Sequence, residues 1–233
     1  MSWAAGLAAL LLLPDGGAAG GAPAPAAVDP GSPGGPPSDA IVLFDGKDIS
    51  RWKGRNGEPR WEVKDGILTV LPGTGDLTTR DAFGDIQLHI EWRIPAGVTG
   101  EGEARGNSGI KFHEAYEIQI LDSHGKPPTL TGAGALYKQA TPLVNASRKP
   151  GEWQVFDIVF RAPRFDAAGA LAQNGTVTVF QNGVLIHDRA KIQGRTNSTM
   201  PVKPDLEQPF FLQDHGSPVS FRNIWVRKLA GAG

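Results

Sequence analysis

The segment 106–122, GNSGIKFHEAYEIQILD, constrains the fold more than any other stretch of the chain. On each side of a short reversal, apolar and polar residues alternate with a period of two, as they do in strands that have one face in a core. Placing both apolar sets on the same face pairs Phe112 with Tyr116. The segment therefore predicts a β-hairpin with a short loop at 113–115.

The predicted hairpin gathers three polar side chains, Lys111, Glu117 and Gln119, on the face opposite to the apolar one. An ammonium, a carboxylate and an amide on one rigid patch are suited to binding or to acid–base chemistry. The competing explanation is an ordinary cross-strand ion pair between Lys111 and Glu117, which contributes about 0.2–1 kcal/mol on an exposed face. From this segment alone, both explanations stay open.

Short strands separated by turn signals recur along the rest of the chain. Segment 83–94 alternates most regularly and places Trp92 on the apolar side and Arg93 on the polar side. Asp-Gly at 65–66 and Asn-Gly at 182–183 each join two short apolar runs, which is a strong hairpin signal. The 31 glycines and 19 prolines also favour many turns over helices. The chain is therefore predicted to form an all-β, antiparallel β-sandwich, in particular a jelly roll.

The last predicted strand, 219–226, breaks its own alternation once. Phe221 and Ile224 are both apolar but lie an odd number of positions apart, so a regular strand would turn them to opposite faces. A β-bulge adds one residue to a strand and moves the later side chains to the other face. We therefore predict a bulge near 222–223 that returns Ile224 to the core.

Composition excludes several classes of function. A formal net charge of −1 provides no electrostatic basis for binding nucleic acid or an anionic membrane. The chain has no cysteine, which excludes disulfides, thiolate metal sites, a cysteine nucleophile and a lipid anchor on cysteine. The sequence contains no tight spacing of His, Asp and Glu, no phosphate-binding glycine loop and no dinucleotide fingerprint. We therefore predict neither a metal nor another cofactor.

Residues 1–38 differ in composition from the rest of the chain. The run 10–13 (LLLL) is too short to span a bilayer, which takes about 20 apolar residues. It fits the apolar part of an export signal with cleavage somewhere in 18–27. Residues 14–38 are almost all Gly, Ala or Pro, which bury too little apolar area to offset their ordering entropy, so they are predicted to be a disordered tether. We expect a secreted or periplasmic protein with one folded domain at 39–229.

A series of sequence blocks occurs in order along this domain. The blocks are LFDGKDIS (43–50), GNSGI (106–110), YEIQILDS (116–123), GALY (134–137), NASRKPGEW (145–153), QNGV (181–184) and LQDHGSPVSFRNIWVR (212–227). They resemble the 3-keto-disaccharide hydrolase domain family, long catalogued only as a domain of unknown function, over about residues 41–229. The resemblance implies a concanavalin-A-like jelly roll and cleavage of glycosides whose sugar carries a ketone at C3. Members tend to have glycine where this chain has Glu114, so we expect a strained or rearranged turn there.

The implied substrate suggests a particular reaction. A ketone at C3 acidifies the hydrogen on C2, and removing that hydrogen while the C1 substituent departs is a β-elimination that breaks the glycosidic bond. Addition of water then makes the outcome a net hydrolysis. The reaction needs a base near C2, a proton donor at the leaving oxygen, and a cation or dipole at the enolate oxygen. Ordinary glycosidases instead need two carboxylates that flank C1.

Two residues are the candidate acid–base pair for this reaction. Glu117 lies on the polar side of a predicted central strand, and His215 lies in a tight turn at the end of another. The candidates for contacting the substrate are Lys111, Gln119, Asp122, Lys138, Asp214 and His89. Either lysine could stabilise the enolate, and Gln119 could orient a sugar hydroxyl. For both aspartates a turn-forming role competes, since Asp bonds its own backbone in turns. His89 and Glu91 point to the same side of one predicted strand, which fits a substrate contact and equally fits an ordinary exposed polar face of a sandwich.

Three interpretations of the whole chain remain open. The first is an exported enzyme that cleaves 3-keto-glycosides, and the second is a non-catalytic, lectin-like module that binds carbohydrate. The third is a structural domain on a tether. A binding module would rely on aromatic platforms, and an aromatic content of 8% leans toward the enzyme. The expected partner is a small carbohydrate, and the sequence does not indicate an oligomeric state.

Overall fold

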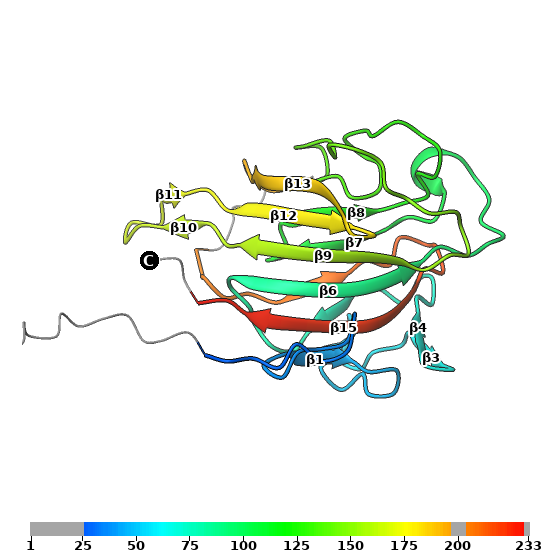
Figure 1. Ribbon diagram of the computed structural model, residues 1–233, viewed down its shortest axis with the longest axis horizontal. Helices are drawn as coiled ribbons and strands as arrows, with labels where there is room; N and C mark the ends of the chain where they lie inside the picture. Colours follow the sequence, from blue (N-terminus) through cyan, green and yellow to red (C-terminus); the bar gives the residue numbers. More distant parts are fainter. Residues whose placement is uncertain (1–25, 197–203, 231–233) are drawn as a thin grey trace, which may run out of the picture.

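The computed structural model describes residues 26–196 and 204–230 as two antiparallel sheets packed face to face, with a small two-stranded ribbon beside them (Figure 1). The predicted export signal falls within residues 1–25, outside the described residues. Within the described residues the only helix is one 3₁₀ turn, η1 (Gly102–Ala104), and none is long and apolar enough to cross a membrane. The prediction of an all-β, antiparallel jelly-roll sandwich is confirmed.

The larger sheet has the strand order β13-β12-β9-β6-β15-β4-β3, with β1 also paired to β15. Its strands are β1 (Ile41–Phe44), β3 (Glu62–Lys64), β4 (Ile67–Thr69), β6 (Ile86–Arg93), β9 (Gln154–Arg161), β12 (Thr176–Gln181), β13 (Val184–Lys191) and β15 (Ser220–Lys228). The smaller sheet has the order β2-β5-β14-β7-β8. Its strands are β2 (Trp52–Lys53), β5 (Leu77–Thr79), β7 (Ser108–Phe112), β8 (Tyr116–Ile120) and β14 (Phe210–Leu212). The ribbon consists of β10 (Arg164–Phe165) and β11 (Leu171–Gln173).

The core lies between the sheets and consists of alternate residues of their strands. In β6 the even-numbered positions from Ile86 to Trp92 are all buried, as the alternation predicts. Phe112 of the smaller sheet stacks on Phe160 of the larger sheet, with ring centroids 4.6 Å apart. Because successive strand residues point to opposite faces, each sheet keeps a second face that is turned away from this core.

The predicted hairpin and its register are confirmed. β7 pairs with β8 so that Phe112 lies opposite Tyr116, which leaves 113–115 as the loop. The Ala115 amide donates to the Phe112 carbonyl oxygen at 2.9 Å, and both His113 and Glu114 have positive φ, at 52° and 53°. Left-handed backbone at both central positions is the type I′ geometry that tight hairpins prefer, although it is strained for residues other than glycine. The expected strain at Glu114 is therefore present.

The predicted bulge in β15 is also confirmed. The pairing of β15 with β6 changes register between Arg222 and Trp225, and Asn223 has a φ of 46°. Phe221 and Ile224 are both fully buried in consequence. The bulge turns Asn223 to the outer face of the larger sheet, where its side chain can bond to chain segments outside the sandwich.

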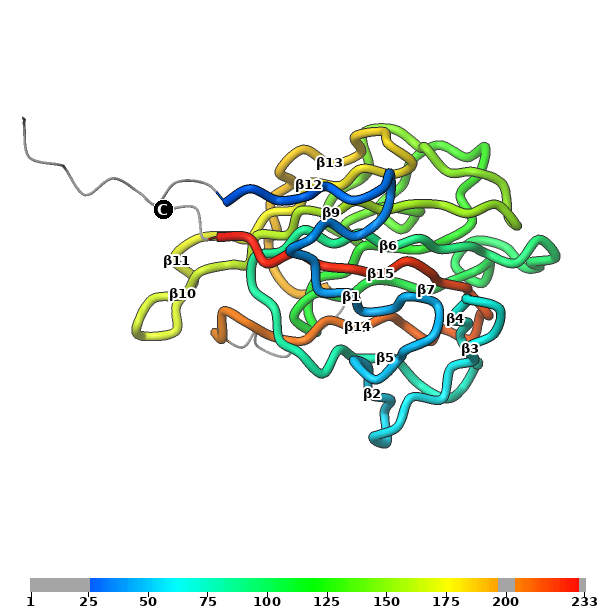
Figure 2. The backbone as a smooth tube through the Cα atoms, turned by 60° about the horizontal axis from the view of Figure 1, so that its bottom comes forward, coloured from blue at the N-terminus to red at the C-terminus, as the bar shows by residue number. Residues whose placement is uncertain are grey.

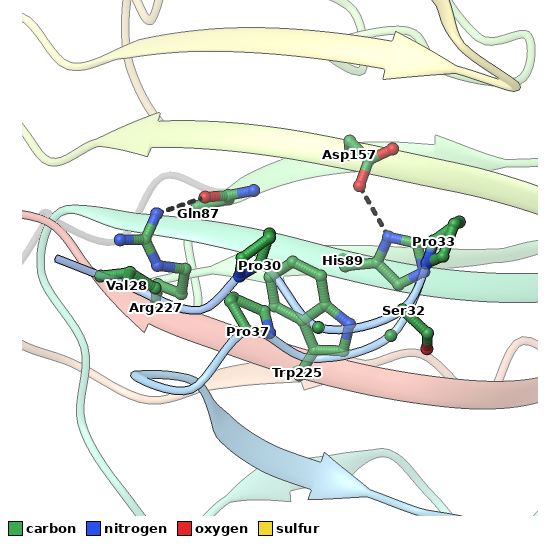
Figure 3. Close-up of a pocket in the computed structure, with 13 residues that line it drawn as sticks. Val28, Pro30, Ser32, Pro33, Pro37, Gln87, His89, Asp157, Trp225 and Arg227 are labelled. Carbon is green, nitrogen blue, oxygen red and sulfur yellow. Dashed lines mark hydrogen bonds and ion pairs between the residues drawn. The ribbon is translucent and has the colours of Figure 1, made fainter.

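Residues 26–38, called the strap below, lie against this outer face. The sequence predicts a disordered tether here, whereas Asn223 Nδ2 donates to the Gly34 carbonyl oxygen at 2.6 Å. Figure 2 shows the strap, in blue, as a loop that runs out along the molecule and doubles back into β1. A cavity of about 610 Å³ lies between the strap and the sheet (Figure 3). The strap is therefore in contact with the sandwich, which its composition does not reveal.

His89 and Trp225 lie beside the strap on the outer face of the larger sheet (Figure 3). Their rings stack with centroids 5.0 Å apart, and His89 Nδ1 is 2.6 Å from Asp157 Oδ1. Although both side chains point away from the core, His89 is only 4% exposed and Trp225 only 5% exposed. The strap thus shields aromatic surface that would otherwise contact water.

We expect a shortened protein that begins at residue 39 to be less stable than one that begins at residue 26, by about 1–3 kcal/mol. Without the strap the indole of Trp225 gains solvent exposure, and the Asn223 amide loses its bond to the strap backbone. Urea unfolding of the two shortened proteins measures the difference. Equal free energies of unfolding would mean that the strap packs on the sheet without stabilising it.

Candidate active site

The face of the smaller sheet that is turned away from the core, called the polar face below, carries a row of side chains. Glu117 of β8 lies opposite Lys111 of β7, and Lys111 lies opposite Phe211 of β14. Phe211 in turn lies opposite Thr78 of β5. Because directly opposed residues point to the same face, this register sets the four side chains in one line across the sheet.

A cavity of about 170 Å³ opens over the β7 and β8 end of the polar face. We call this cavity the site pocket. Its lining residues are Glu103, Asn107, Lys111, Glu117, Gln119, Tyr137, Gln213 and His215. The structure therefore brings together four of the residues that the sequence singles out, Lys111, Glu117, Gln119 and His215.

Glu117 is the most deeply placed ionisable group of the site pocket, with only 4% of its surface exposed. Burial raises the pKa of this carboxyl above its ordinary value, and the nearby charges of Lys111 and His215 act in the opposite direction. Lys111 Nζ is 3.7 Å from Glu117 Oε2. When the Gln119 amide is oriented to suit its neighbours, its nitrogen donates to the Ser108 carbonyl oxygen at 2.9 Å and to Glu117 Oε1 at 3.2 Å. A carboxylate in this environment is held in place and is a stronger base than an exposed one.

His215 approaches Glu117 from a different part of the chain. It lies in the turn after β14, is exposed, and places Nδ1 at 3.3 Å from Asn107 Nδ2. The amide orientation of Asn107 and the protonation of His215 Nδ1 are linked across this contact, which orients the imidazole ring. Asn107 is itself buried, and its backbone N–H donates to Ser217 Oγ at 3.2 Å. The contact thereby holds the histidine ring by its Nδ1 edge.

A loop docked on the edge of β8 forms one wall of the site pocket. The Gly134 amide donates to the Gln119 carbonyl oxygen at 2.8 Å, and the Tyr137 amide donates to the Glu117 carbonyl oxygen at 2.9 Å. These bonds continue the sheet beyond β8 and fix Tyr137 beside the site. The Tyr137 hydroxyl donates to both carboxylate oxygens of Glu103, at 2.9 and 3.0 Å.

The absence of a side chain at Gly109 leaves room for the side chains of Glu117 and Gln213 to approach the backbone of β7. A side chain at Gly109 would place its Cβ only 2.9 Å from Glu117 Oε1 and 3.0 Å from Gln213 Oε1. Glycine within a strand commonly marks such a close approach. Gln213 Oε1 is buried and has no hydrogen-bond partner among the described residues, so it is an acceptor that a ligand in the pocket could satisfy.

Asp122 and His89 are not brought to the site pocket. Asp122 pairs with Arg105 Nε at 2.5 Å and accepts a bond from the His124 amide, so it anchors the loops that follow β8. His89 lies on β6 of the other sheet, on the face covered by the strap. Neither residue lines the site pocket, so the structure does not place these two predicted substrate contacts beside Glu117.

Asp214 and Lys138 lie at the margins of the site pocket. Asp214 accepts bonds from the Gly75 amide at 2.9 Å and from the Gly216 amide at 3.0 Å, which is the turn-forming role that the sequence leaves open. Lys138 is exposed, with Nζ 5.2 Å from the centre of the Tyr137 ring. Lys111 is therefore the lysine that lies nearer to Glu117 in the pocket.

Four lining residues were missed by the sequence analysis, namely Glu103, Asn107, Tyr137 and Gln213. Asn107, Tyr137 and Gln213 each fall within a block that carries the family resemblance, which is the one signal that could have marked them. Within the part of the chain that the structure describes, no group of three or more His, Cys, Asp and Glu side chains is arranged to hold a metal ion.

Comparisons with known proteins agree with this architecture. A family model described as 3-keto-alpha-glucoside-1,2-lyase-like domain matches residues 39–227. The 3-keto-disaccharide hydrolase of Bacteroides thetaiotaomicron is 26% identical over 248 aligned positions, which cover 81% of this chain and 78% of that protein. A crystal structure of a candidate glycosyl hydrolase from Parabacteroides distasonis is 46% identical, with a TM-score of 0.82 over 89% of this chain and 93% of the other. A second structure from that organism is 22% identical, with a TM-score of 0.62 over 82% and 94%, and shows likeness of fold alone.

Proposed function

The chain belongs to the family of 3-keto-alpha-glucoside-1,2-lyase-like domains, and from this premise we propose that it cleaves glycosides whose sugar is oxidised to a ketone at C3. Its relatives support a carbohydrate-active protein of the glycosyl hydrolase kind. One observation carries the finer proposal. The buried carboxylate Glu117 lies 3.7 Å from the Lys111 ammonium, in a pocket that His215 also lines.

The reaction assigns one task to each of these three groups. Glu117 removes the proton from C2, and the electrons of that C–H bond form a double bond between C1 and C2 while the bond from C1 to the leaving oxygen breaks. His215, as an imidazolium, gives its Nε2 proton to the leaving oxygen and becomes a neutral imidazole, and Lys111 stabilises the negative charge that develops on the C3 oxygen. The products are an unsaturated 3-ketone and a free alcohol. Addition of water across the double bond then gives the 3-keto sugar, so no oxidant or reductant is consumed.

The other pocket residues support these three. Gln119 holds the Glu117 carboxylate and Asn107 holds His215, so both reacting side chains are preorganised. The Gln213 oxygen, which has no hydrogen-bond partner among the described residues, lines the pocket and can accept a bond from a sugar hydroxyl. Glu103 provides a second carboxylate, whose oxygens already accept from Tyr137.

The assay that tests the proposal compares an oxidised glycoside with its unoxidised parent on the wild-type protein. Cleavage of the 3-keto-glycoside alone is expected, because without the ketone the C2 hydrogen is not acidic. Binding of both compounds with cleavage of neither would instead establish the lectin-like alternative. Cleavage of the unoxidised glycoside at a comparable rate would indicate direct hydrolysis by two carboxylates and would overturn the elimination mechanism.

As the pH is lowered, the enzyme is expected to lose activity at a pH above the ordinary pKa of a glutamate side chain. Burial raises the pKa of Glu117, and a general base works only when deprotonated, so the rate is lost as the pH drops through this raised pKa. The pH dependence of kcat/KM measures the midpoint. In Lys111→Met the midpoint should move further up, because the ammonium favours the charged carboxylate. A midpoint that moved down would contradict the assigned pair.

Gly109→Ala is expected to lower kcat/KM by about tenfold or more, with little change in the free energy of unfolding. The added methyl group would press on the Glu117 and Gln213 side-chain oxygens and displace the base from its position. Steady-state kinetics and urea unfolding test the two parts separately. Gly97→Ala, in the exposed loop after β6 where an added Cβ meets nothing within 4 Å, is the matched control and should leave both quantities unchanged.

We also propose that the protein is exported, on the basis of the apolar run at 10–13 followed by small residues. Expression in a bacterial host, cell fractionation and N-terminal sequencing of the recovered protein would test this. A mature chain that begins within 18–27 is expected, and an unprocessed chain confined to the cytoplasm would refute the proposal.

A further inference from the structure

We infer that Asp76 is a positioning residue, which holds the turn that carries His215 and, through its negative charge, favours the protonated form of that histidine. The inference deepens the proposed function and rests on it, because that function requires His215 to act as an imidazolium. Neither Asp76 nor the segment around it takes part in the reaction as described above.

The order of the strands places Asp76 beside the active site. β5 pairs with β14 so that Leu77 lies opposite Leu212. One further step of this antiparallel register sets Asp76 opposite Gln213, which lines the site pocket. Leu77 is buried in the core, so the adjacent Asp76 points to the polar face. There it lines, together with Thr78, a cavity of about 450 Å³.

Hydrogen bonds to carboxylate oxygens join Asp76 to the turn that carries His215. The Asp214 amide donates to Asp76 Oδ1 at 2.8 Å, and the Gly75 amide donates to Asp214 Oδ2 at 2.9 Å. Asp214 Oδ1 in turn accepts from the Gly216 amide at 3.0 Å. His215 therefore lies between two residues that this set of bonds holds in place.

The segment that carries Asp76 is itself anchored to the core. Trp61 Nε1 donates to the Gly75 carbonyl oxygen at 3.0 Å, and the Trp61 ring stacks on Phe221 with centroids 5.7 Å apart. Gly75 has a φ of 89°, which favours glycine, and an added Cβ would lie 3.0 Å from the Cβ of Arg55. Asp76 is thus held by a fixed support, as a residue that positions another must be.

The proposed reaction requires opposite charges on its two reacting groups at the same pH. Glu117 must be deprotonated to accept the C2 proton, whereas His215 must be protonated to donate. The ammonium of Lys111, which lines the same pocket, disfavours a second positive charge there. A further carboxylate near His215 would offset this repulsion and keep the proton donor charged.

Of the further carboxylates around His215, Asp76 is best suited to this task. Both Glu103 oxygens accept from the Tyr137 hydroxyl, and both Asp214 oxygens accept from backbone amides. Asp76 accepts through Oδ1, and its Oδ2 has no hydrogen-bond partner among the described residues. The charge of Asp76 is therefore the least committed to other contacts.

The electrostatic link between Asp76 and His215 acts in both directions. Burial raises the pKa of the Asp76 carboxyl, whereas the bond from the Asp214 amide and the charges of Lys111 and His215 act in the opposite direction. Since the interaction is mutual, a negative charge at Asp76 favours the protonated imidazole. The charged and titratable groups that surround His215 are Lys111 of β7, Glu117 of β8, Glu103 of η1, Tyr137, Arg55, Asp76 and Asp214.

Asp76→Asn tests the inference, because asparagine keeps an oxygen that can accept from the Asp214 amide and removes the charge. The titration of His215 is followed by NMR through its Cε1–H signal, which is identified by its absence in His215→Ala. We expect the titration midpoint to move to lower pH by about half a pH unit, since solvent screens part of the interaction at this exposed residue. Asp188→Asn removes an exposed carboxylate from β13 of the larger sheet and, as the matched control, should leave the midpoint unchanged.

Kinetics on a 3-keto-glycoside provide a second measurement. In Asp76→Asn the basic limb of the pH profile of kcat/KM should move to lower pH together with the His215 midpoint, which lowers kcat/KM about threefold at pH values above it. Asp76→Ala loses the hydrogen bond as well as the charge and should lower kcat/KM further at every pH. Should Asp76→Asn not fold, Asp76→Ser provides another uncharged acceptor at this position.

The outcomes separate this inference from the proposed function. If the His215 midpoint does not move in Asp76→Asn or Asp76→Ser, the inference is overturned. A loss of activity that is equal at every pH, with the midpoint unchanged, would make Asp76 a structural anchor of the turn and would overturn it as well. If the midpoint moves as expected but the wild type cleaves no 3-keto-glycoside, the link between Asp76 and His215 stands and the proposed function fails.

Discussion

Replacing Glu117 with glutamine is expected to lower the turnover of a 3-keto-glycoside by about 10²–10⁴-fold. Glutamine keeps the shape of the side chain but cannot accept a proton from C2. The expected loss corresponds to about 2.7–5.5 kcal/mol of transition-state stabilisation. Single-turnover kinetics on the wild type and Glu117→Gln measure it directly, and they separate the chemical step from product release.

The fold should not suffer from this substitution. Because burial raises the pKa of Glu117 in the folded protein, folding favours the protonated form, and the charged carboxylate costs stability at neutral pH. That cost disappears on acidification or on replacement by a neutral amide. Glu117→Gln is therefore expected to have a Tm equal to or above that of the wild type. A stable but inactive variant would distinguish a functional carboxylate from a structural ion pair with Lys111.

Two further variants complete the experiment. His215→Ala should lose activity to a similar extent if His215 is the proton donor, and a substrate with a leaving group that needs no proton should recover much of the loss. Glu91→Gln removes a carboxylate from the outer face of the larger sheet, where Glu91 Oε2 accepts from Arg222 Nε at 2.6 Å. This control should keep wild-type turnover. If Glu117→Gln also kept it, Glu117 would not be the base.

Trp92→Ala is expected to destabilise the protein by about 3–5 kcal/mol, through lost burial and the cavity left behind. Trp92 is fully buried in β6, and its ring lies 5.2 Å from that of Phe156 between centroids. Arg93→Ala, one position along the strand, should cost under about 1 kcal/mol. The Arg93 guanidinium lies on the outer face, where it stacks on the Trp153 ring, 4.6 Å from its centroid.

Urea unfolding of both variants at one temperature measures this contrast. Trp92→Phe provides a milder control, because it keeps an aromatic ring and removes a buried indole N–H that has no partner within residues 26–196 and 204–230. It should recover part of the stability that alanine loses. Comparable losses for Trp92→Ala and Arg93→Ala would show that β6 is buried equally on both faces.

Much of the smaller sheet follows from local alternation alone. The period-two pattern and the positions of turn residues determine which side chains share a face, so the sequence suffices to place Lys111, Glu117 and Gln119 together. The same rule locates the bulge near Asn223, because only an extra residue returns Ile224 to the core. The sequence by itself determined these features because each depends on residues within one strand or one hairpin.

The tertiary structure alone decided which of the polar groups meet. Asn107 and His215 are 108 positions apart, and they touch because β14 pairs with the opposite edge of β7 from β8. His89, in contrast, is kept away from Glu117, because its strand belongs to the other sheet and its side chain lies beside the strap. The strap itself could not be foreseen, because its low apolar content predicts disorder, whereas a bulged asparagine and an outward-facing indole hold it. The alternation of residues along a strand shows which side chains share a face of the sheet. Which other side chains lie next to them depends on the order of the strands in the sheet, and that order is known only from the tertiary structure.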